Sequence, residues 1–218
     1  MATNNPRGFV EYRHLGGAVK PSTRMFRARD NGDALQLQHQ PIRAGDMVCL
    51  VSGNRVARFP SDTSAAPAHG PTMPCGVVRS VFQNVNGQPR PYTHSVSGAV
   101  INASADGWVA VNIDPFQTYL VNTDSTVTPN IVGLFVGTTC LASPAIPGQS
   151  GYSVALASPV GVMVTAQFIQ VIGLGAGDED NLIATAGAPA NLNSDVEVVF
   201  GLHAFGNKSL PVLSVKPI

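Results

Sequence analysis

The run from Val171 to Asp180, VIGLGAGDED, holds the residue types that come closest to a ligand site in this chain. Its glycines alternate as in a phosphate-binding loop, but three acids follow them and no Lys-Ser or Lys-Thr pair is present. A phosphate site uses a helix N-terminus and positive charge, whereas Asp178, Glu179 and Asp180 would repel an anion. The acids are consecutive rather than alternating as in an EF-hand loop, which leaves a calcium site shared between subunits as the alternative. We expect a strand that ends in an exposed turn, with no metal and no cofactor.

Other residue types that can do chemistry are dispersed along the chain. Gly148-Gln149-Ser150-Gly151 lacks the G-x-S-x-G spacing of a nucleophile elbow. The histidines show no H-E-x-x-H pattern and no pair at metal spacing; they are His14, His39, His69, His94 and His203. The cysteines form no C-x-x-C pair and are expected to be buried free thiols; they are Cys49, Cys75 and Cys140. The sequence therefore predicts a protein that is not an enzyme and has no catalytic residues and no small-molecule substrate.

Charge is scarce and unevenly distributed. Charged residues make up 12% of the chain, against about 25% in average proteins. Residues 1–90 contain 11 basic and 5 acidic side chains, a net charge of +6, and residues 91–218 contain 2 basic and 8 acidic ones, a net charge of −6. Such a split can orient a docking surface or let copies attract each other head to tail, unless the fold mixes the two halves in space.

The hydrophobic pattern predicts strands separated by turns. Short runs rich in Val, Ile, Phe and Thr alternate with turn residues, and 39 of the 218 residues are Gly or Pro, which leaves little room for helices. We expect an all-β fold, a β-barrel or jelly-roll-like sandwich of short strands with long loops. The expected strands are Phe9–Arg13, Arg24–Arg29, Asp33–Gln40, Met47–Val51, Arg55–Phe59, Gly76–Phe82, Gly98–Asn102, Trp108–Ile113, Phe116–Val121, Ile131–Val136, Tyr152–Ala157, Thr165–Leu174, Val196–Phe200 and Val212–Lys216.

Turn signals fall between these strands. Ser52-Gly53-Asn54 and Asp106-Gly107 are expected to close hairpins, and Asp114-Pro115 to end one strand and redirect the chain. Pro60–Pro74 and Ala184–Asn193 are expected to be exposed loops. We expect residues 1–22 to form an arm or first strand and residues 23–218 a single β domain, with a possible subdivision near the 60–74 loop.

Nothing in the sequence indicates export or a membrane. The first residues, MATNNPRGFVEYRH, contain no apolar signal-peptide core, and no apolar run reaches the roughly 18 residues that span a bilayer. Nucleic-acid binding would depend on Arg7, Arg13, Arg24, Arg27 and Arg29, which come with little aromatic stacking surface in a chain of zero net charge. A basic strand that meets an acidic protein surface fits these residues as well as one that meets phosphates; as partners we expect no membrane and no nucleic acid.

Two segments of the chain resemble a known family. The first is GFVEYRHLGGA, residues 8–18, followed by Arg24-Met25-Phe26 and by Gly45-Asp46 before an apolar strand. The second is residues 148–182, which contain VIGLGAGDEDNL and are followed by Asp195-Val196-Glu197-Val198. Both resemble the capsid cement (head decoration) proteins of tailed bacteriophages.

The resemblance implies a function that composition and spacing do not supply. It implies an all-β homotrimer, assembled in the host cytoplasm, that lies on the outer capsid surface of the virion and cements neighbouring major capsid protein subunits. It also implies that VIGL is a core strand and GAGDED its exposed turn. The residues expected to contact the capsid are Arg7, Phe9, Tyr12, Arg13, Arg24, Phe26, Arg27 and Arg29, because arginines with aromatics beside them are typical of interface hot spots.

The alternative function is a β-rich carbohydrate-binding or carbohydrate-active phage protein. Glycoside hydrolysis needs two carboxylates at a fixed separation, and Asp106, Asp114 and Asp124 are the mid-chain candidates. Carbohydrate binding needs exposed aromatics, and one Trp and four Tyr supply few. The sequence favours the structural function over this alternative.

Overall fold

The described part of the molecule is built from strands, as the sequence predicts. The structure is a computed structural model that describes residues 8–16, 22–28, 42–51, 55–59, 74–85, 88–91, 100–101, 107–124, 129–140, 150–161, 168–174, 195–201 and 203–204. The strands are β1 (Val10–His14), β2 (Thr23–Ala28), β3 (Ile42–Arg43), β4 (Met47–Val51), β5 (Arg55–Arg58), β6 (Pro74–Val85), β7 (Gln88–Pro91), β8 (Val100–Ile101), β9 (Gly107–Asn112), β10 (Gln117–Asn122), β11 (Phe135–Cys140), β12 (Tyr152–Val160), β13 (Ile169–Leu174) and β14 (Asp195–Phe200). One 3-10 turn, η2 (Pro129–Ile131), is the only helical element of the described residues. Among these residues, none belongs to a helix long and apolar enough to cross a bilayer.

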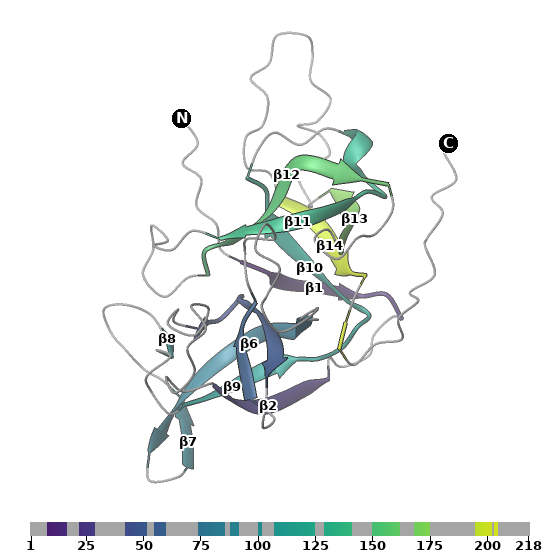
Figure 1. The fold of residues 1–218 in the computed structure, drawn as a ribbon. Coiled ribbons are helices and arrows are strands. Elements are labelled where there is room, and N and C mark those ends of the chain that lie inside the picture. The colour runs from purple at the N-terminus through teal and green to yellow at the C-terminus, as the bar shows by residue number, and fades with distance from the viewer. Residues whose placement is uncertain are drawn as a thin grey trace.

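Five strands between Thr23 and Asn112 close into a barrel. They pair in the order β4-β5-β2-β9-β6, and β6 pairs back onto β4. The pairing of β2 with β5 is parallel and the other four are antiparallel, while β7 extends β6 as a hairpin beyond the barrel. Apolar side chains from all five strands form one buried cluster, in which Phe26, Val48, Val56, Val78 and Val109 meet. This barrel lies at the lower end of the molecule in Figure 1.

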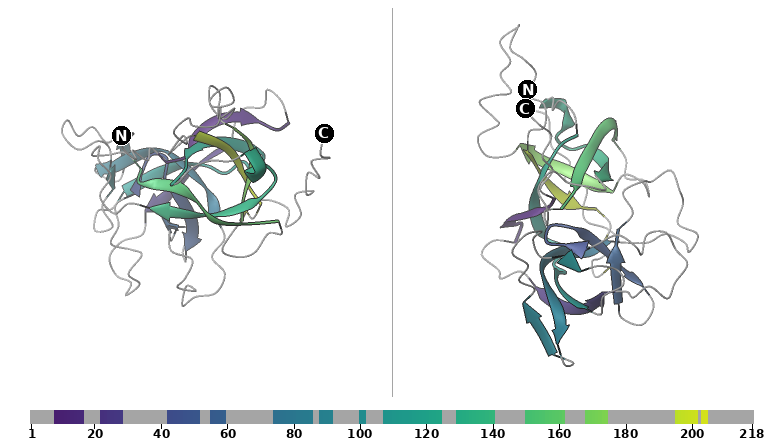
Figure 2. Two further views of the ribbon diagram at one scale, coloured as in Figure 1. Left: turned by 90° about the horizontal axis from the view of Figure 1, so that it is seen from above. Right: turned by 90° about the vertical axis from the view of Figure 1, so that its left-hand side faces the viewer.

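The first strand and the second half of the chain form a curled sheet in the order β1-β10-β14-β13-β11-β12. Its far end bends back on itself, since Thr123, just after β10, forms a bridge with Val154 of β12. The Asp124 amide also donates a hydrogen bond to the Val154 carbonyl, over 3.0 Å. Figures 1 and 2 show this sheet stacked on the barrel. The chain crosses from barrel to sheet between β9 and β10, where Asp114-Pro115 ends one strand and redirects the chain as predicted.

Side chains of β4 point alternately into the cores of the barrel and of the sheet. Val48 and Leu50 point into the barrel, whereas Met47 and Cys49 belong to the core of the sheet with Phe9 and other aromatics. One wall of the barrel therefore also covers the sheet. Cys49 and Cys75 are buried free thiols, as predicted, and burial raises the pKa of Cys75.

Two predicted elements are corrected by the structure. The segment Gly98–Asn102 was expected to form a hairpin with Trp108–Ile113, but β8 pairs with β3, and β9 lies between β2 and β6. The segment Ile131–Val136 is not one strand. Pro129 begins a 3-10 turn, Gly133 has a φ of +90°, and β11 starts only at Phe135, because this backbone reverses direction before it extends.

Other expectations lie outside the described residues. They are the strands Asp33–Gln40 and Val212–Lys216, the turns Ser52-Gly53-Asn54 and Asp178-Glu179-Asp180, residues 60–73 of the first predicted loop and the whole of the second, Ala184–Asn193. The strands on either side of Ser52-Gly53-Asn54 do pair as an antiparallel hairpin, with Val51 opposite Arg55.

Gly76 lets β6 change faces. Its φ is +146°, and a Cβ atom there would lie 1.9 Å from the Asn112 carbonyl oxygen of β9. Because of this backbone, Cys75 belongs to the barrel core and Val77 to the sheet core, although they are two residues apart. A regular strand would place both on one face.

We expect Gly76→Ala to lower the free energy of unfolding by about 2 kcal/mol or more, because it adds a backbone clash to a strained φ. Two controls separate these causes. Gly133→Ala has the strained φ but open space around the added carbon, and should cost about 1 kcal/mol. Gly161→Ala has neither, and should change stability by less than about 0.5 kcal/mol. Urea unfolding measures all three, and equal losses for Gly76→Ala and Gly133→Ala would rule out the clash.

Candidate protein-docking surface

Among the described residues, basic side chains gather in the barrel and acidic ones in the sheet, although β1 of the basic half belongs to the sheet and β9 of the acidic half to the barrel. Among the described residues from 22 to 112, which form the barrel and its extensions, seven are Arg and the one acid is Asp46. Among the described residues of the sheet and its connections, Arg13 is the one Lys or Arg, and five are acids: Glu11, Asp114, Asp124, Asp195 and Glu197. In the described residues charge is therefore separated between the two units, while β1 and β9 mix the two halves of the chain.

The exposed side chains of β2, which we call the β2 arginine surface, lie on both faces of the strand: Arg24 on the face of Phe26, and Met25 and Arg27 on the opposite face, beside Trp108 of β9. The Arg24 guanidinium lies 5.3 Å from the centre of the Phe26 ring, and the Arg27 guanidinium lies 5.3 Å from the Trp108 ring. Such stacking holds a guanidinium in place without neutralising it. In the described part of the chain neither arginine has a carboxylate partner, so both keep their charge for a ligand.

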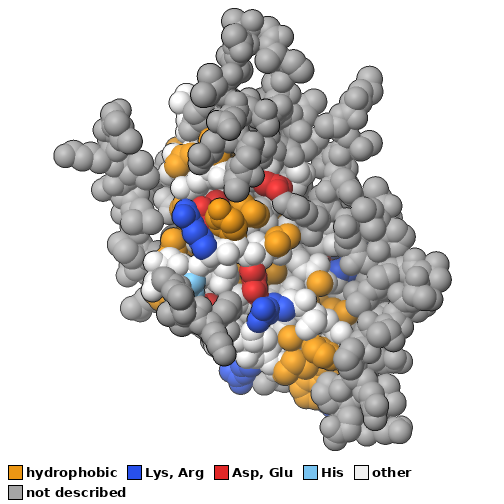
Figure 3. All heavy atoms as spheres, turned by 180° about the vertical axis from the view of Figure 1, so that it is seen from behind, with side chains coloured by type: hydrophobic (Ala, Val, Ile, Leu, Met, Phe, Trp, Pro, Cys, Tyr) orange, Lys and Arg blue, Asp and Glu red, His pale blue; other side chains and the backbone are white. Residues whose placement is uncertain are grey.

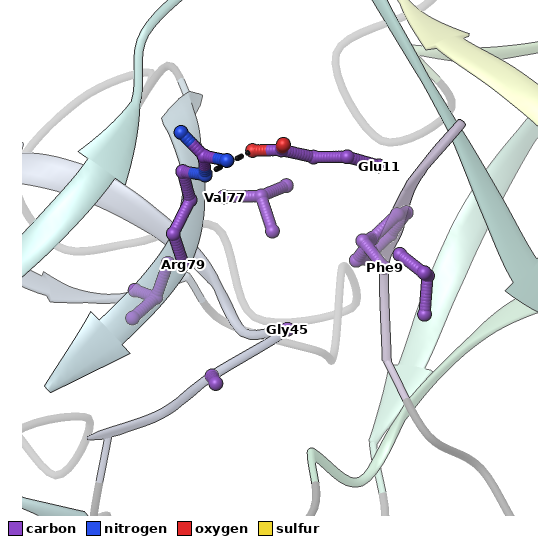
Figure 4. A pocket seen from close by; sticks show the side chains of 8 residues that line it. Phe9, Glu11, Gly45, Val77 and Arg79 are labelled. Carbon is purple, nitrogen blue, oxygen red and sulfur yellow. Dashed lines mark ion pairs between the residues drawn. The ribbon is translucent and has the colours of Figure 1, made fainter. Parts of the chain in front are cut away.

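Arg79 of β6 joins β1 to the barrel. Its Nε pairs with the Glu11 carboxylate at 2.9 Å, and its Nη1 donates to the Thr23 hydroxyl at 3.1 Å. The Asn112 amide also donates to Glu11, at 2.9 Å. Figure 4 shows the Glu11–Arg79 pair beside a pocket of about 340 Å³, lined by Phe9, Val10, Glu11, Ala44, Gly45, Val77, Val78 and Arg79. The charges at this pocket are already paired with each other.

Arg13 of β1 is likewise neutralised within the chain. Its Nε and Nη2 each donate to a different oxygen of Glu197 on β14, both at 2.6 Å. Glu197 is buried, and this bidentate bond with its charge raises the pKa of Arg13. The first glycine of the VIGLGAGDED run makes room for the carboxylate, because a Cβ on Gly173 would lie 3.2 Å from Glu197 Oε2. Gly173 thus belongs to a strand, as expected for VIGL.

The residues predicted to contact a capsid fall into four groups. Arg24 and Arg27 are exposed and lack a carboxylate partner among the described residues, whereas Tyr12 and Arg13 are exposed and Arg13 is bound to Glu197. Phe9 and Phe26 are 2% and 0% exposed. Their expected role as surface anchors is corrected, because their rings fill the two cores. Arg7 and Arg29 lie outside the described residues.

Asp46 is a buried carboxylate at the seam between barrel and sheet, and its burial was not predicted from the sequence. Asp46 is fully buried, accepts a hydrogen bond from the Arg43 amide at 2.8 Å, and lies 3.5 Å from Nε of Arg58. Burial raises the pKa of Asp46, and the nearby Arg58 charge opposes that rise. Arg58 in turn lies 4.9 Å from the centre of the Tyr152 ring of β12. The feature of the sequence that could have indicated this burial is the pair Gly45-Asp46 directly before the apolar strand Met47–Val51.

The same turn binds both units through its backbone. The Phe9 amide donates to the Gly45 carbonyl at 2.9 Å, and the Val78 amide donates to the Asp46 carbonyl at 2.9 Å. Ser150, from the sequence GQSG, is buried and its hydroxyl accepts a hydrogen bond from the Tyr152 amide.

Within the described residues, no three His, Cys, Asp or Glu side chains gather as metal ligands would. Comparisons with protein families, curated proteins and solved structures found no match.

His203 packs at the same seam. Its ring is stacked on Phe200 with the centroids 6.4 Å apart, and the next residue, Ala204, donates its amide hydrogen to the Pro74 carbonyl at 2.8 Å. Burial lowers the pKa of His203 from 6.5 to about 4, although the charge of Asp114 opposes the shift. The unfolded chain therefore takes up a proton near pH 6.5, while the folded chain does not until about pH 4.

This difference predicts acid sensitivity. The contribution of His203 is complete above pH 6.5 and is lost as the pH falls, by about 2 kcal/mol between pH 7 and pH 5. His203→Phe keeps a ring beside Phe200 and cannot take up a proton, so its unfolding free energy should fall less over this range. Urea titrations of both proteins at the two pH values measure the difference. Equal losses would show that His203 is protonated as easily in the folded state as in the unfolded one.

Arg13 is predicted to stabilise the edge of the sheet, unlike the β2 arginines. Arg13→Gln leaves the buried Glu197 without its cation and should cost about 1–2 kcal/mol, discounted because the Arg13 side chain is largely exposed. Arg24→Gln removes an arginine that has no carboxylate partner in the described residues, and should change stability by less than about 0.5 kcal/mol. Chemical denaturation measures both, and similar losses would contradict the assignment of Arg13 to a structural pair.

Proposed function

We propose that this protein is a non-enzymatic structural protein that binds an acidic protein surface through the β2 arginine surface. The observation that carries the proposal is the pair Arg24 and Arg27, which are exposed, stacked on aromatic rings, and without a carboxylate partner in the described part of the chain. Met25, which is 37% exposed, adds apolar contact beside Arg27, on the face of β2 opposite Arg24. Arginine, aromatic and methionine side chains are the types enriched in protein interfaces.

The chemistry of this surface suits a carboxylate-bearing partner. A guanidinium fork binds a carboxylate in a defined geometry, and stacking reduces the entropy that the side chain loses on binding. One or two such contacts give modest affinity. Many copies on a repeating lattice add their contributions, so that a weak contact still reinforces the whole assembly.

We propose further that the partner is the major capsid protein of a tailed phage, and that the chain is a trimeric cement protein on the outer capsid surface. The support is the resemblance of residues 8–18 and 148–182 to that family. These two segments are remote in sequence, yet their strands β1, β12 and β13 belong to one sheet, together with β14, which contains the Asp195–Val198 motif. The other residues of the resemblance, Arg24-Met25-Phe26 and Gly45-Asp46, belong to the barrel, in β2 and directly before β4.

We expect Arg24→Ala/Arg27→Ala to weaken binding to tailed-phage heads stripped of this protein by at least tenfold, which corresponds to about 1.4 kcal/mol. Wild-type binding should also weaken as salt rises, because exposed charges are screened. Co-sedimentation with the heads measures both effects. Asn130→Asp/Ala204→Asp is the control, since it changes the net charge by the same amount at exposed positions away from β2. Undiminished decoration by the arginine variant would refute the docking surface, and equal weakening by the control would assign the effect to net charge alone.

A further inference from the structure

Exposed apolar side chains gather around the first strand. The described residues include five exposed large hydrophobics, and three of them are Val10, Tyr12 and Leu15, at 42%, 45% and 42% exposure. A fourth, Phe116, is 48% exposed and lies beside them, because its carbonyl accepts a hydrogen bond from the Leu15 amide and its ring contacts His14. We call these four residues the β1 edge surface. Apolar side chains gathered on a surface in this way mark an interaction site.

β1 is also the edge of its sheet. It pairs with β10 on one side, and it ends the strand order on the other. The pairing of β1 with β10 is irregular between Glu11 and His14. There the Arg13 amide donates to the Thr118 hydroxyl, and the Arg13 carbonyl accepts hydrogen bonds from the Thr118 hydroxyl and the Gln117 side-chain amide. Bulged edges of this kind resist the addition of a further strand. A partner at this edge is therefore bound by side chains.

The charges of this edge are compensated within the chain. Glu11 is bound by Arg79 and Asn112, Arg13 by Glu197, and His14 Nε2 lies 3.0 Å from the Asp114 carboxylate. On the face seen in Figure 3, basic and acidic side chains lie next to each other among exposed apolar ones. The β2 arginine surface has no such compensation in the described residues. Two copies would repel each other through β2, but not through β1.

We infer that the β1 edge surface is the interface between copies of this chain. Interfaces between identical subunits are more apolar and poorer in free charge than other interfaces, which fits β1 and not β2. Beside Val10, the pocket of Figure 4 offers a recess for an apolar side chain of the neighbouring copy. The inference deepens the proposed function, which requires the copies to assemble. It moves Tyr12 from the capsid contact to the contact between copies, and Arg13 stays in its pair with Glu197.

The test compares two variants that add equal charge to different surfaces. Tyr12→Lys/Phe116→Lys places two cations on the β1 edge surface, and Ser22→Lys/Met25→Lys places two on exposed positions of the β2 side. Analytical ultracentrifugation from about 1 to 100 µM gives the assembly state of each, a range in which subunit contacts of ordinary size remain associated. We expect the wild type and the Ser22/Met25 variant to form the same oligomer. The Tyr12/Phe116 variant should dissociate to monomer or bind its copies at least tenfold more weakly, with an unchanged circular dichroism spectrum.

Each outcome decides the inference. A wild type that is monomeric throughout, or a Tyr12/Phe116 variant that assembles as well as wild type, overturns it. If the Tyr12/Phe116 variant loses its native spectrum, the milder Leu15→Gln replaces it, with Met25→Gln as its control, and unchanged assembly by Leu15→Gln then overturns the inference. The assay contains no phage heads. Failure of assembly is therefore distinct from failure of the proposed function, which appears as decoration that does not depend on Arg24 and Arg27.

Discussion

The arrangement of the two β units depends on one carboxylate that has no access to water. Asp46 lies at the seam, where Arg58 and the Arg43 amide approach it. An ionised carboxylate in such a place is costly unless a cation and hydrogen-bond donors surround it, and breaking a buried ion pair costs about 3–5 kcal/mol. Those groups come from β3 and β5, and the backbone beside Asp46 binds Phe9, directly before β1, and Val78 of β6. The turn that contains Asp46 is therefore bonded both to the barrel and to the start of the sheet.

The sequence predicted much of the local structure. Met47–Val51 has the predicted bounds, and Asp114-Pro115 ends one strand before the next begins, because alternation and turn chemistry are properties of adjacent residues. Pairing between remote segments was not predictable in this way. Nothing near Val100 indicates that its partner is Arg43, since a two-residue strand has no periodicity to recognise.

The surface was predicted less well than the strands. Arg24 and Arg27 are exposed as expected, but Phe26, on the same face of β2 as Arg24, points into the barrel. Alternation separates the faces of a strand without saying which one is inside. Asp46 resembles an ordinary turn residue in sequence, and only the three-dimensional structure brings Arg58 to it. Arg13 likewise looks available until its partner, Glu197, is placed beside it from the far end of the chain. Whether a charge is free or compensated therefore depends on contacts that the sequence does not contain.

The separation of β1 from its neighbours in sequence has a consequence for how the chain acquires its structure. β1 comes before every strand of the barrel, yet its partner β10 begins only at Gln117. β14, whose Glu197 binds Arg13 of β1, begins only at Asp195. During synthesis the barrel strands through β9 are complete before β10 has emerged, so the barrel can form while β1 still has no sheet to join. Contacts of such long separation slow folding, because a large loop must close before they form. Until β10 has been made, the apolar side chains of β1 have no sheet to pack against, and the Arg13–Glu197 pair beside Tyr12 can form only once β14 has been made.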